Sequence, residues 1–223
     1  MQQKSALLIG ASGLTGSHLL QLLLESEAYH TVYAYNRKPL GIEHAKLKEI
    51  IIDFDTYQGT VDATDVFCCL GTTIKKAGSK KAFKKVDLSY PVKFAQLQYQ
   101  AGSQQFLVIS AMGVSEKSFV FYNQVKAAME KEISAIGYNS LGIFRPALIT
   151  GDRKEHRAGE KIAVVVFGWL NKFLTGTLRK YQSIPAAEIA LGMLHYSNMV
   201  PTKKLAIILS DEIKDLAEGK TPL

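Results

Sequence analysis

Short apolar runs recur along the chain, and segments with helical periodicity separate most of them. The runs are rich in β-branched and aromatic residues and are nearly unbroken, which is typical of strands covered on both faces. We expect seven strands, over residues 5–10, 31–35, 49–54, 65–71, 105–110, 141–146 and 204–209. We expect helices over residues 14–26, 80–101, 122–137, 161–174 and 185–197. This alternation predicts an α/β fold with a doubly wound parallel sheet.

The length of 223 residues suits a single domain. From Gly151 onward the pattern changes to a charged loop, two helices and one strand. We interpret residues 151–203 as most of a small C-terminal lobe that faces the substrate, within one domain that spans residues 1–223. The link between the third and fourth strands, DFDTYQGTVDAT, has room for a turn of helix at most.

Composition, at 47% hydrophobic and 21% charged residues, is that of a soluble globular protein. The N-terminal residues lack the pattern of a secretory signal, and the longest apolar run, residues 162–170, is too short to span a bilayer. The two cysteines, Cys68 and Cys69, are adjacent, and a disulfide between strand neighbours would be strained. They indicate thiols in a reducing compartment, and we predict a cytoplasmic protein without a membrane span.

The net charge of +7 suits an anionic cofactor, and much of the excess lies in residues 73–85. Ser79 can cap a helix whose first turn is rich in lysines. A helix dipole disfavours cations at this end, so these lysines need an explanation. One explanation is that they bind a cofactor phosphate or an acidic substrate. A solvated face is the other. The basic loop after Gly151 can also recognise an anionic group of the substrate, or its Arg157 can simply pair with Glu160. Nucleic-acid binding would rest on net charge alone and is not expected, and no histidines have metal-ligand spacing.

A glycine-rich turn, GASGLTG, comes directly after the first expected strand and opens the first expected helix. Residues without side chains allow a tight turn and a close approach of the backbone to a pyrophosphate, and the helix N-terminus supplies free N–H groups. A second strand follows roughly twenty residues later, as a dinucleotide-binding unit requires. The turn therefore predicts a Rossmann-type fold that binds a nicotinamide dinucleotide through Gly10, Ser12, Gly13, Leu14, Thr15 and Gly16.

The residues after the other strands refine this prediction. Arg37 follows the second strand where NAD-binding proteins usually carry an acidic residue, so it can hold a 2′-phosphate and favours NADP(H) over NAD(H). Asp53 ends the third strand, where it can accept a hydrogen bond from the adenine amino group or cap the following turn. The turn after the fourth strand lies across the expected switch point from the first strand. Its predicted cofactor-binding residues are Leu70, Gly71 and Thr72.

Tyr122 and Lys126 lie four residues apart in an expected helix, which places both side chains on one face. Together with GASGLTG, CLGTTIKKAGS, the serine that ends the fifth strand and FRPALITGDRKEHRAGE, they resemble the short-chain dehydrogenase/reductases. The pattern is most similar to the atypical, Tat-interacting-protein-like branch, from the first strand to about Glu160. The resemblance implies that Tyr122 is a general acid and that Lys126 binds the nicotinamide ribose and lowers the pKa of the phenol. A nearby ammonium is also the physical remedy for a phenol of high pKa.

Ser110, at the end of the fifth strand, is the candidate for the hydroxyl that positions the substrate carbonyl. Relatives in this branch often carry two serines in a row, whereas Ala111 occupies the second place here, and Ser115 and Ser118 are alternatives. Short-chain enzymes often add an asparagine from the preceding helix, where this chain offers Asp87. Pro146, after the sixth strand, completes the predicted cofactor-binding set.

The sequence therefore predicts an NADP(H)-dependent oxidoreductase that reduces a carbonyl of a small molecule, as a monomer or a homodimer. The alternative is a regulatory protein that senses NADP(H) without turnover, which Ala111 and Asp87 favour and the intact Tyr122–Lys126 pair opposes. One scaffold can host both roles, so the fold alone does not separate them.

Overall fold

A computed structural model describes residues 3–151, 174–200 and 202–220. Its centre is a seven-stranded, wholly parallel sheet in the order β3-β2-β1-β4-β5-β6-β9. The strands are β1 (Lys4–Ile9), β2 (Tyr29–Asn36), β3 (Leu47–Ile51), β4 (Asp65–Cys68), β5 (Gln105–Ile109), β6 (Ser140–Arg145) and β9 (Leu205–Leu209). The order reverses between β1 and β4, which is the switch point where such sheets bind ligands.

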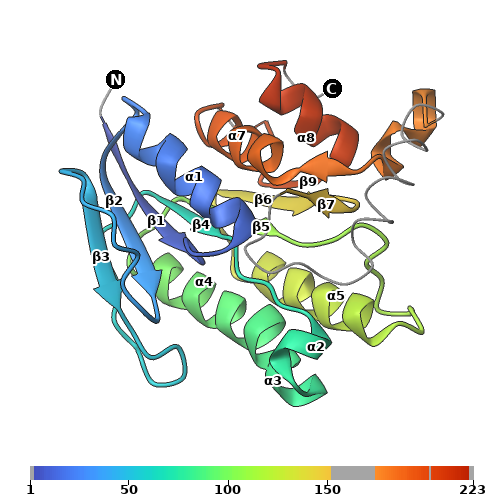
Figure 1. Ribbon diagram of the computed structural model, residues 1–223, viewed down its shortest axis with the longest axis horizontal. Helices are drawn as coiled ribbons and strands as arrows, with labels where there is room; N and C mark the ends of the chain where they lie inside the picture. Colours follow the sequence, from blue (N-terminus) through green and yellow to red (C-terminus); the bar gives the residue numbers. More distant parts are fainter. Residues whose placement is uncertain (1–2, 152–173, 201, 221–223) are drawn as a thin grey trace.

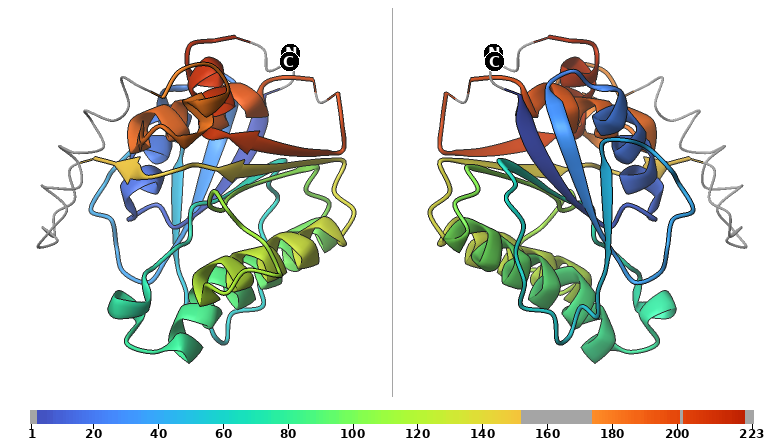
Figure 2. Two further views of the ribbon diagram at one scale, coloured as in Figure 1. Left: turned by 90° about the vertical axis from the view of Figure 1, so that its right-hand side faces the viewer. Right: turned by 90° about the vertical axis from the view of Figure 1, so that its left-hand side faces the viewer.

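Helices cover both faces of the sheet. The upper layer in Figures 1 and 2 holds α1 (Leu14–Glu25), α7 (Ala186–Ser197) and α8 (Ser210–Ala217), and the lower layer holds α4 (Tyr90–Gln100) and α5 (Phe121–Ser134). Shorter elements are α2 (Ile74–Ala77), α3 (Lys80–Lys84), a π-helical turn (Lys85–Ser89), a 3-10 helix (Gly176–Tyr181) and the two-stranded sheet of β7 (Ile149–Thr150) and β8 (Ile184–Pro185). The predicted doubly wound parallel fold is confirmed.

The sheet has a separate hydrophobic core on each face. Successive side chains of a strand point to opposite faces, so alternate residues pack in different cores. In β1, Ala6 and Leu8 pack in the upper core against α1 and α7, whereas Leu7 and Ile9 pack in the lower core against α4 and α5. All four side chains are fully buried. This explains why the strands read as unbroken apolar runs in the sequence.

Several element boundaries differ from the sequence-based expectation. The fourth strand ends at Cys68 rather than residue 71, because the chain turns there toward α2. The expected helix over residues 80–101 is divided by the π-helical turn, and α8 was not expected at all. The link between β3 and β4 holds only a turn, as expected.

The predicted C-terminal lobe is only partly described. Its helix α7 packs against α1 on the upper face of the sheet. The expected helix over residues 161–174 and the basic loop after Gly151 fall almost entirely on residues 152–173, which lie outside the described residues. The lobe therefore stays a prediction. No helix in the described ranges is long and apolar enough to cross a membrane.

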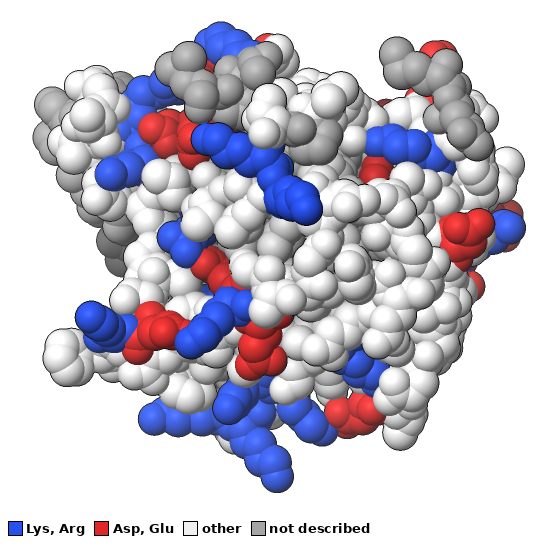
Figure 3. Space-filling model, turned by 180° about the vertical axis from the view of Figure 1, so that it is seen from behind, with Lys and Arg blue, Asp and Glu red and all other residues white. Residues whose placement is uncertain are grey.

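The lysine-rich stretch forms α2 and α3, which project from the lower layer in Figure 1. Figure 3 views the molecule from behind, and Lys and Arg side chains gather there at the lower edge, over these two helices. Thr73 caps α2 by accepting a hydrogen bond from Lys76 N, and Ser79 caps α3 by accepting one from Ala82 N. Ser79 thus has the capping role expected from the sequence.

Candidate active site

The glycine turn connects β1 to α1 in a way that excludes side chains at two positions. Gly10 has a φ of +92°, and a Cβ there would lie 2.9 Å from the backbone carbonyl of Cys69. A Cβ at Gly16 would lie 2.1 Å from the carbonyl oxygen of Gly10, so α1 could not start where it does. Glycine is therefore required at both positions by the backbone itself.

The start of α1 suits an anion. Gly13 is the N-cap residue of α1, with no side-chain cap, and the first turn carries no acidic residue. Ser12 and Gly13 are exposed, Leu14 is half-buried and Thr15 is buried. The uncapped N–H groups of this turn are the donors that a pyrophosphate would use.

Arg37 lies exposed just after β2, where its guanidinium can reach a ligand. The neighbouring Asn36 is buried and donates to Glu49 Oε1 at 2.9 Å, and Leu40 N donates to the same oxygen at 2.8 Å. Glu49 is therefore occupied in holding the turn after β2. Asp53 is exposed, and its Oδ1 accepts a hydrogen bond from Asp55 N at 2.8 Å. The structure thus shows the turn-capping role for Asp53 that the sequence left open.

Asp87 connects the loop after β4 to α5. Thr72 N donates to Asp87 Oδ2 at 2.9 Å, and Asp87 Oδ1 pairs with Lys126 Nζ at 2.9 Å. Gly71 packs beside this carboxylate, and a Cβ there would lie 3.7 Å from Asp87 Oδ1, an ordinary van der Waals distance. The π-helical turn carries Asp87, and such turns are frequent at functional sites.

The ion pair between Asp87 and Lys126 is almost completely buried, with side-chain exposures of 1% and 3%. Lys126 Nζ also donates to the carbonyl oxygen of Ile109, at the end of β5, at 3.3 Å. Burial alone would lower the pKa of Lys126, but the attraction of Asp87 outweighs it and the pKa is raised. Lys126 is therefore a fixed positive charge. The sequence drew attention to Asp87 only as a departure from an asparagine, although a buried acid beside a lysine is the pairing that burial demands.

Tyr122 lies one helical turn before Lys126, and its ring packs on Phe83 with centroids 5.5 Å apart. Burial raises the pKa of the Tyr122 phenol, the charge of Lys126 acts to lower it, and the charge of Asp87 raises it. The net effect is a raised pKa. The charge of Lys126 thus lowers the pKa of Tyr122, as expected, but burial and Asp87 raise it by more. The phenol is therefore protonated at neutral pH.

Ser110 is buried, and its hydroxyl donates to Glu130 Oε1. Glu130 also accepts two hydrogen bonds from Arg145, which form an ion pair with it. Glu130 lies four residues after Lys126, so both project from the same face of α5. Sequence reasoning missed Glu130 and Arg145. Their only signal was this helical spacing and the position of Arg145 just before Pro146.

The structure thus brings Tyr122, Lys126 and the loop around Thr72 together but directs the Ser110 hydroxyl elsewhere. No hydrogen bond in the described part of the chain joins Ser110 to Tyr122. Pro146 is buried, and its carbonyl oxygen accepts a hydrogen bond from Met112 N.

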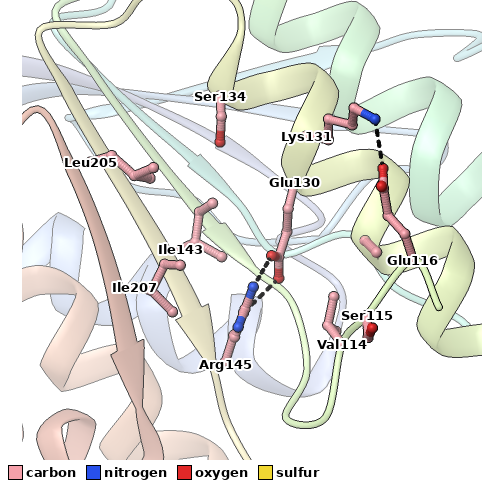
Figure 4. A pocket seen from close by; sticks show the side chains of 11 residues that line it. Val114, Ser115, Glu116, Glu130, Lys131, Ser134, Ile143, Arg145, Leu205 and Ile207 are labelled. Atoms are coloured by element: carbon pink, nitrogen blue, oxygen red, sulfur yellow. Dashed lines mark hydrogen bonds and ion pairs between the residues drawn. The ribbon is translucent and has the colours of Figure 1, made fainter. Parts of the chain in front are cut away.

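A pocket of about 350 Å³ opens beside this network, between α5 and the edge strand β9 (Figure 4). The Glu130–Arg145 pair lies in it, and apolar side chains of β6 and β9 form one wall. The residues that line it are Val114, Ser115, Glu116, Ala127, Glu130, Lys131, Ser134, Ile143, Arg145, Leu205 and Ile207. None of the predicted cofactor-binding residues lines this pocket, so it is distinct from the proposed dinucleotide crevice. Among the described residues, no group of three or more His, Cys, Asp or Glu could hold a metal ion.

The parallel sheet, the glycine turn at its switch point and the Tyr-Lys pair on α5 define a class, the Rossmann-fold NAD(P)-binding proteins of the short-chain dehydrogenase/reductase type. Solved structures share this fold: MoeE5 in complex with UDP-glucose and NAD is 17% identical with a TM-score of 0.69, covering 98% of this chain and 83% of that one. The PhqB reductase domain of Penicillium fellutanum is 18% identical with a TM-score of 0.64, covering 92% of this chain and 66% of that one.

Sequence relatives narrow the class. The protein HTATIP2 of Rattus norvegicus is 36% identical over 203 residues, covering 87% of this chain and 81% of the relative. The protein FMP52, mitochondrial, of Debaryomyces hansenii is 28% identical over 203 residues, covering 87% and 88%. No family model matches the chain. The chain belongs to the HTATIP2 family, the Tat-interacting-protein-like branch of the atypical short-chain dehydrogenase/reductases, as its motifs indicated.

The prediction of a purely cytoplasmic location is wrong. Relatives from Debaryomyces hansenii, Eremothecium gossypii and Candida albicans are named mitochondrial, which conflicts with a purely cytoplasmic assignment. The prediction relied on reduced cysteines and on the lack of a secretory signal. Both are equally compatible with other compartments inside the cell, so they could not support one compartment over another.

Proposed function

We propose that the protein is an NADP(H)-dependent oxidoreductase that reduces the carbonyl of a small molecule. The observation that carries this proposal is the buried Lys126, which Asp87 and the Ile109 carbonyl hold beside Tyr122. A fixed ammonium next to a partly buried phenol, at the edge of the sheet where ligands bind, is an arrangement for proton transfer.

The chain's residues fit a dinucleotide. The uncapped start of α1, with Ser12 to Gly16, would hold the pyrophosphate, and Lys126 would bind the nicotinamide ribose. When bound, the nicotinamide supplies the hydride that adds to the carbonyl carbon. Tyr122 donates its phenolic proton to the carbonyl oxygen, and its raised pKa keeps that proton in place at neutral pH.

Arg37 supports the preference for NADP(H). It is exposed after β2, and the nearby Glu49 directs one carboxylate oxygen to Asn36 Nδ2 and Leu40 N, away from the role of an acidic residue that binds a ribose. A planar guanidinium binds a 2′-phosphate through paired hydrogen bonds, whereas a free carboxylate would repel it.

A second candidate is a sensor that binds NADP(H) without turnover. The Ser110 hydroxyl favours it, because this hydroxyl donates to Glu130 instead of facing Tyr122. A carbonyl substrate would then lack one of its expected hydrogen-bond donors. Turnover separates the two candidates, since both require dinucleotide binding.

The experiment is NADPH oxidation measured with a panel of aldehydes, ketones and quinones, in the parent protein and in Tyr122→Phe. We expect Tyr122→Phe to bind NADPH normally but to lose at least about a hundredfold in kcat, because only the proton donor is removed. Tyr181→Phe is the control, since Tyr181 is an exposed tyrosine of the 3-10 helix.

Equal turnover in Tyr122→Phe and the parent would remove Tyr122 from the mechanism. NADPH binding without oxidation across the whole panel would favour the sensor.

A further inference from the structure

The excess charge of the protein is concentrated in one short surface stretch. Residues 73–85 contain six lysines and no acidic residue, while the rest of the chain carries a net charge of only +1. The side chains of Lys75, Lys80, Lys81 and Lys84 are exposed on α2 and α3. Lys85 pairs with Asp55 at 2.7 Å. Figure 3 shows the resulting basic edge of the molecule.

Exposed apolar side chains adjoin these lysines. Phe119 has a relative exposure of 104%, and Val120 and Ile74 are 55% and 38% exposed. Their neighbour Phe121 connects them to α3, because Lys80 Nζ lies 5.2 Å from its ring centroid and Phe83 lies 6.0 Å from it. The apolar tip and the lysines thus belong to one surface.

The loop presents Phe119 outward through defined contacts. Ser118 Oγ accepts a hydrogen bond from Val120 N at 3.1 Å, and Ser118 O accepts one from Gln124 Nε2 at 2.8 Å. The nearby acid of the loop, Glu116, is paired with Lys131 at 2.8 Å. A large aromatic ring held in water on both sides costs solvation free energy, which a partner would recover.

We propose that this surface, formed by α2, α3 and residues 118–120, docks on an anionic lipid bilayer, with Phe119 inserted among the headgroups. Basic residues around an exposed aromatic and aliphatic tip are the combination that binds peripheral proteins to anionic membranes. The stretch contains lysines and no arginine, which suits a diffuse layer of headgroup charge better than the bidentate recognition of single phosphates. The proposal does not depend on catalysis.

Sedimentation with vesicles tests it, with NADPH present so that the proposed cofactor site is filled. We expect binding to vesicles of phosphatidylcholine with phosphatidylglycerol, little binding to phosphatidylcholine alone, and release at raised ionic strength. The Lys75→Gln/Lys81→Gln variant should lower the partition coefficient roughly 25-fold, at about fivefold per lysine. Lys203→Gln/Lys204→Gln makes the same charge change on exposed residues before β9, and should alter it less than about twofold.

Variants of Phe119 test the contribution of the apolar tip to vesicle binding. Phe119→Ser should lower the partition coefficient about tenfold, because the buried ring area is lost. In Phe119→Trp, brominated lipids should quench more fluorescence than in the parent, which has one tryptophan.

Three results would overturn the proposal. They are equal binding to neutral and anionic vesicles, equal effects of the two lysine double variants, and no effect of Phe119→Ser. Tighter binding to polyglutamate or duplex DNA than to the anionic vesicles would assign the surface to another partner.

Discussion

Asp87 is the residue that connects the predicted cofactor loop with the Tyr122–Lys126 pair. Its two carboxylate oxygens contact Thr72 N and Lys126 Nζ, and its charge raises the pKa values of both Lys126 and Tyr122. The resemblance to short-chain enzymes implies an asparagine from this helix, where the chain has Asp87. A carboxylate there makes Tyr122 a weaker acid than an amide would, so the proton is held more firmly.

The pH dependence of turnover tests this role. Reduction needs protonated Tyr122, so activity is present below its raised pKa and is lost as the pH rises through it. Asp87→Asn should move this alkaline limb to lower pH by about one unit or more, because both Tyr122 and Lys126 lose the charge that raises their pKa values. The measurement is the pH profile of kcat. A lower kcat with an unmoved limb would mean that Asp87 acts only on structure.

Arg37 sets the second residue-scale prediction. Arg37→Asp should shift the preference from NADPH to NADH, with NADPH affinity falling by roughly tenfold or more, because a carboxylate repels the 2′-phosphate. Binding titrations with both dinucleotides measure this directly. Lys48→Asp is the control, since Lys48 is an exposed lysine of the neighbouring strand β3. An unchanged NADPH-to-NADH ratio would contradict the role of Arg37.

At the scale of elements, α5 and the π-helical turn depend on each other through one buried ion pair. Lys126→Met should lower the free energy of unfolding by about 3–5 kcal/mol, because Asp87 would keep a buried charge without its ammonium partner. The Asp87→Asn/Lys126→Met double variant should lose less than Lys126→Met alone. Urea unfolding of the parent, of Asp87→Asn, of Lys126→Met and of the double variant measures this coupling. Additive losses would show that the pair does not stabilise the contact.

Local sequence patterns predicted most helices and strands, but few of the side-chain contacts between them. The strands and the glycine turn are local features, so their residues alone identified them. The pairing of Asp87 with Lys126, and of Ser110 with Glu130, joins residues 39 and 20 positions apart, and no periodicity reports such contacts. The helix α8 was missed although Asp211 and Glu212 in its first turn are a helix-start signal, because eight residues are too few to show a clear helical period. The fourth strand was extended too far because its apolar run continues past Cys68.

At the scale of the whole molecule, the switch point between β1 and β4 organises the site. Three features lie near this switch point: the glycine turn, the loop at Thr72 and the Tyr122–Lys126 pair on α5. The pocket, in contrast, lies beside β9, the outermost strand of the sheet. The order of the strands therefore explains why residues from positions 10 to 126 can serve one ligand. The described surface also carries the basic edge of α2 and α3, and the membrane docking that we propose for it does not require that ligand.

The central claim is that the turn between β1 and α1 binds a nicotinamide dinucleotide, and calorimetry tests it most directly. Titration of NADPH should give saturable heat at one site per chain. Gly16→Ala should weaken it by about tenfold or more, because its Cβ would meet the Gly10 carbonyl oxygen and displace α1. Ser17→Ala, one residue further on the exposed side of α1, should bind as the parent does. Absence of heat with both NADPH and NADH would contradict the account.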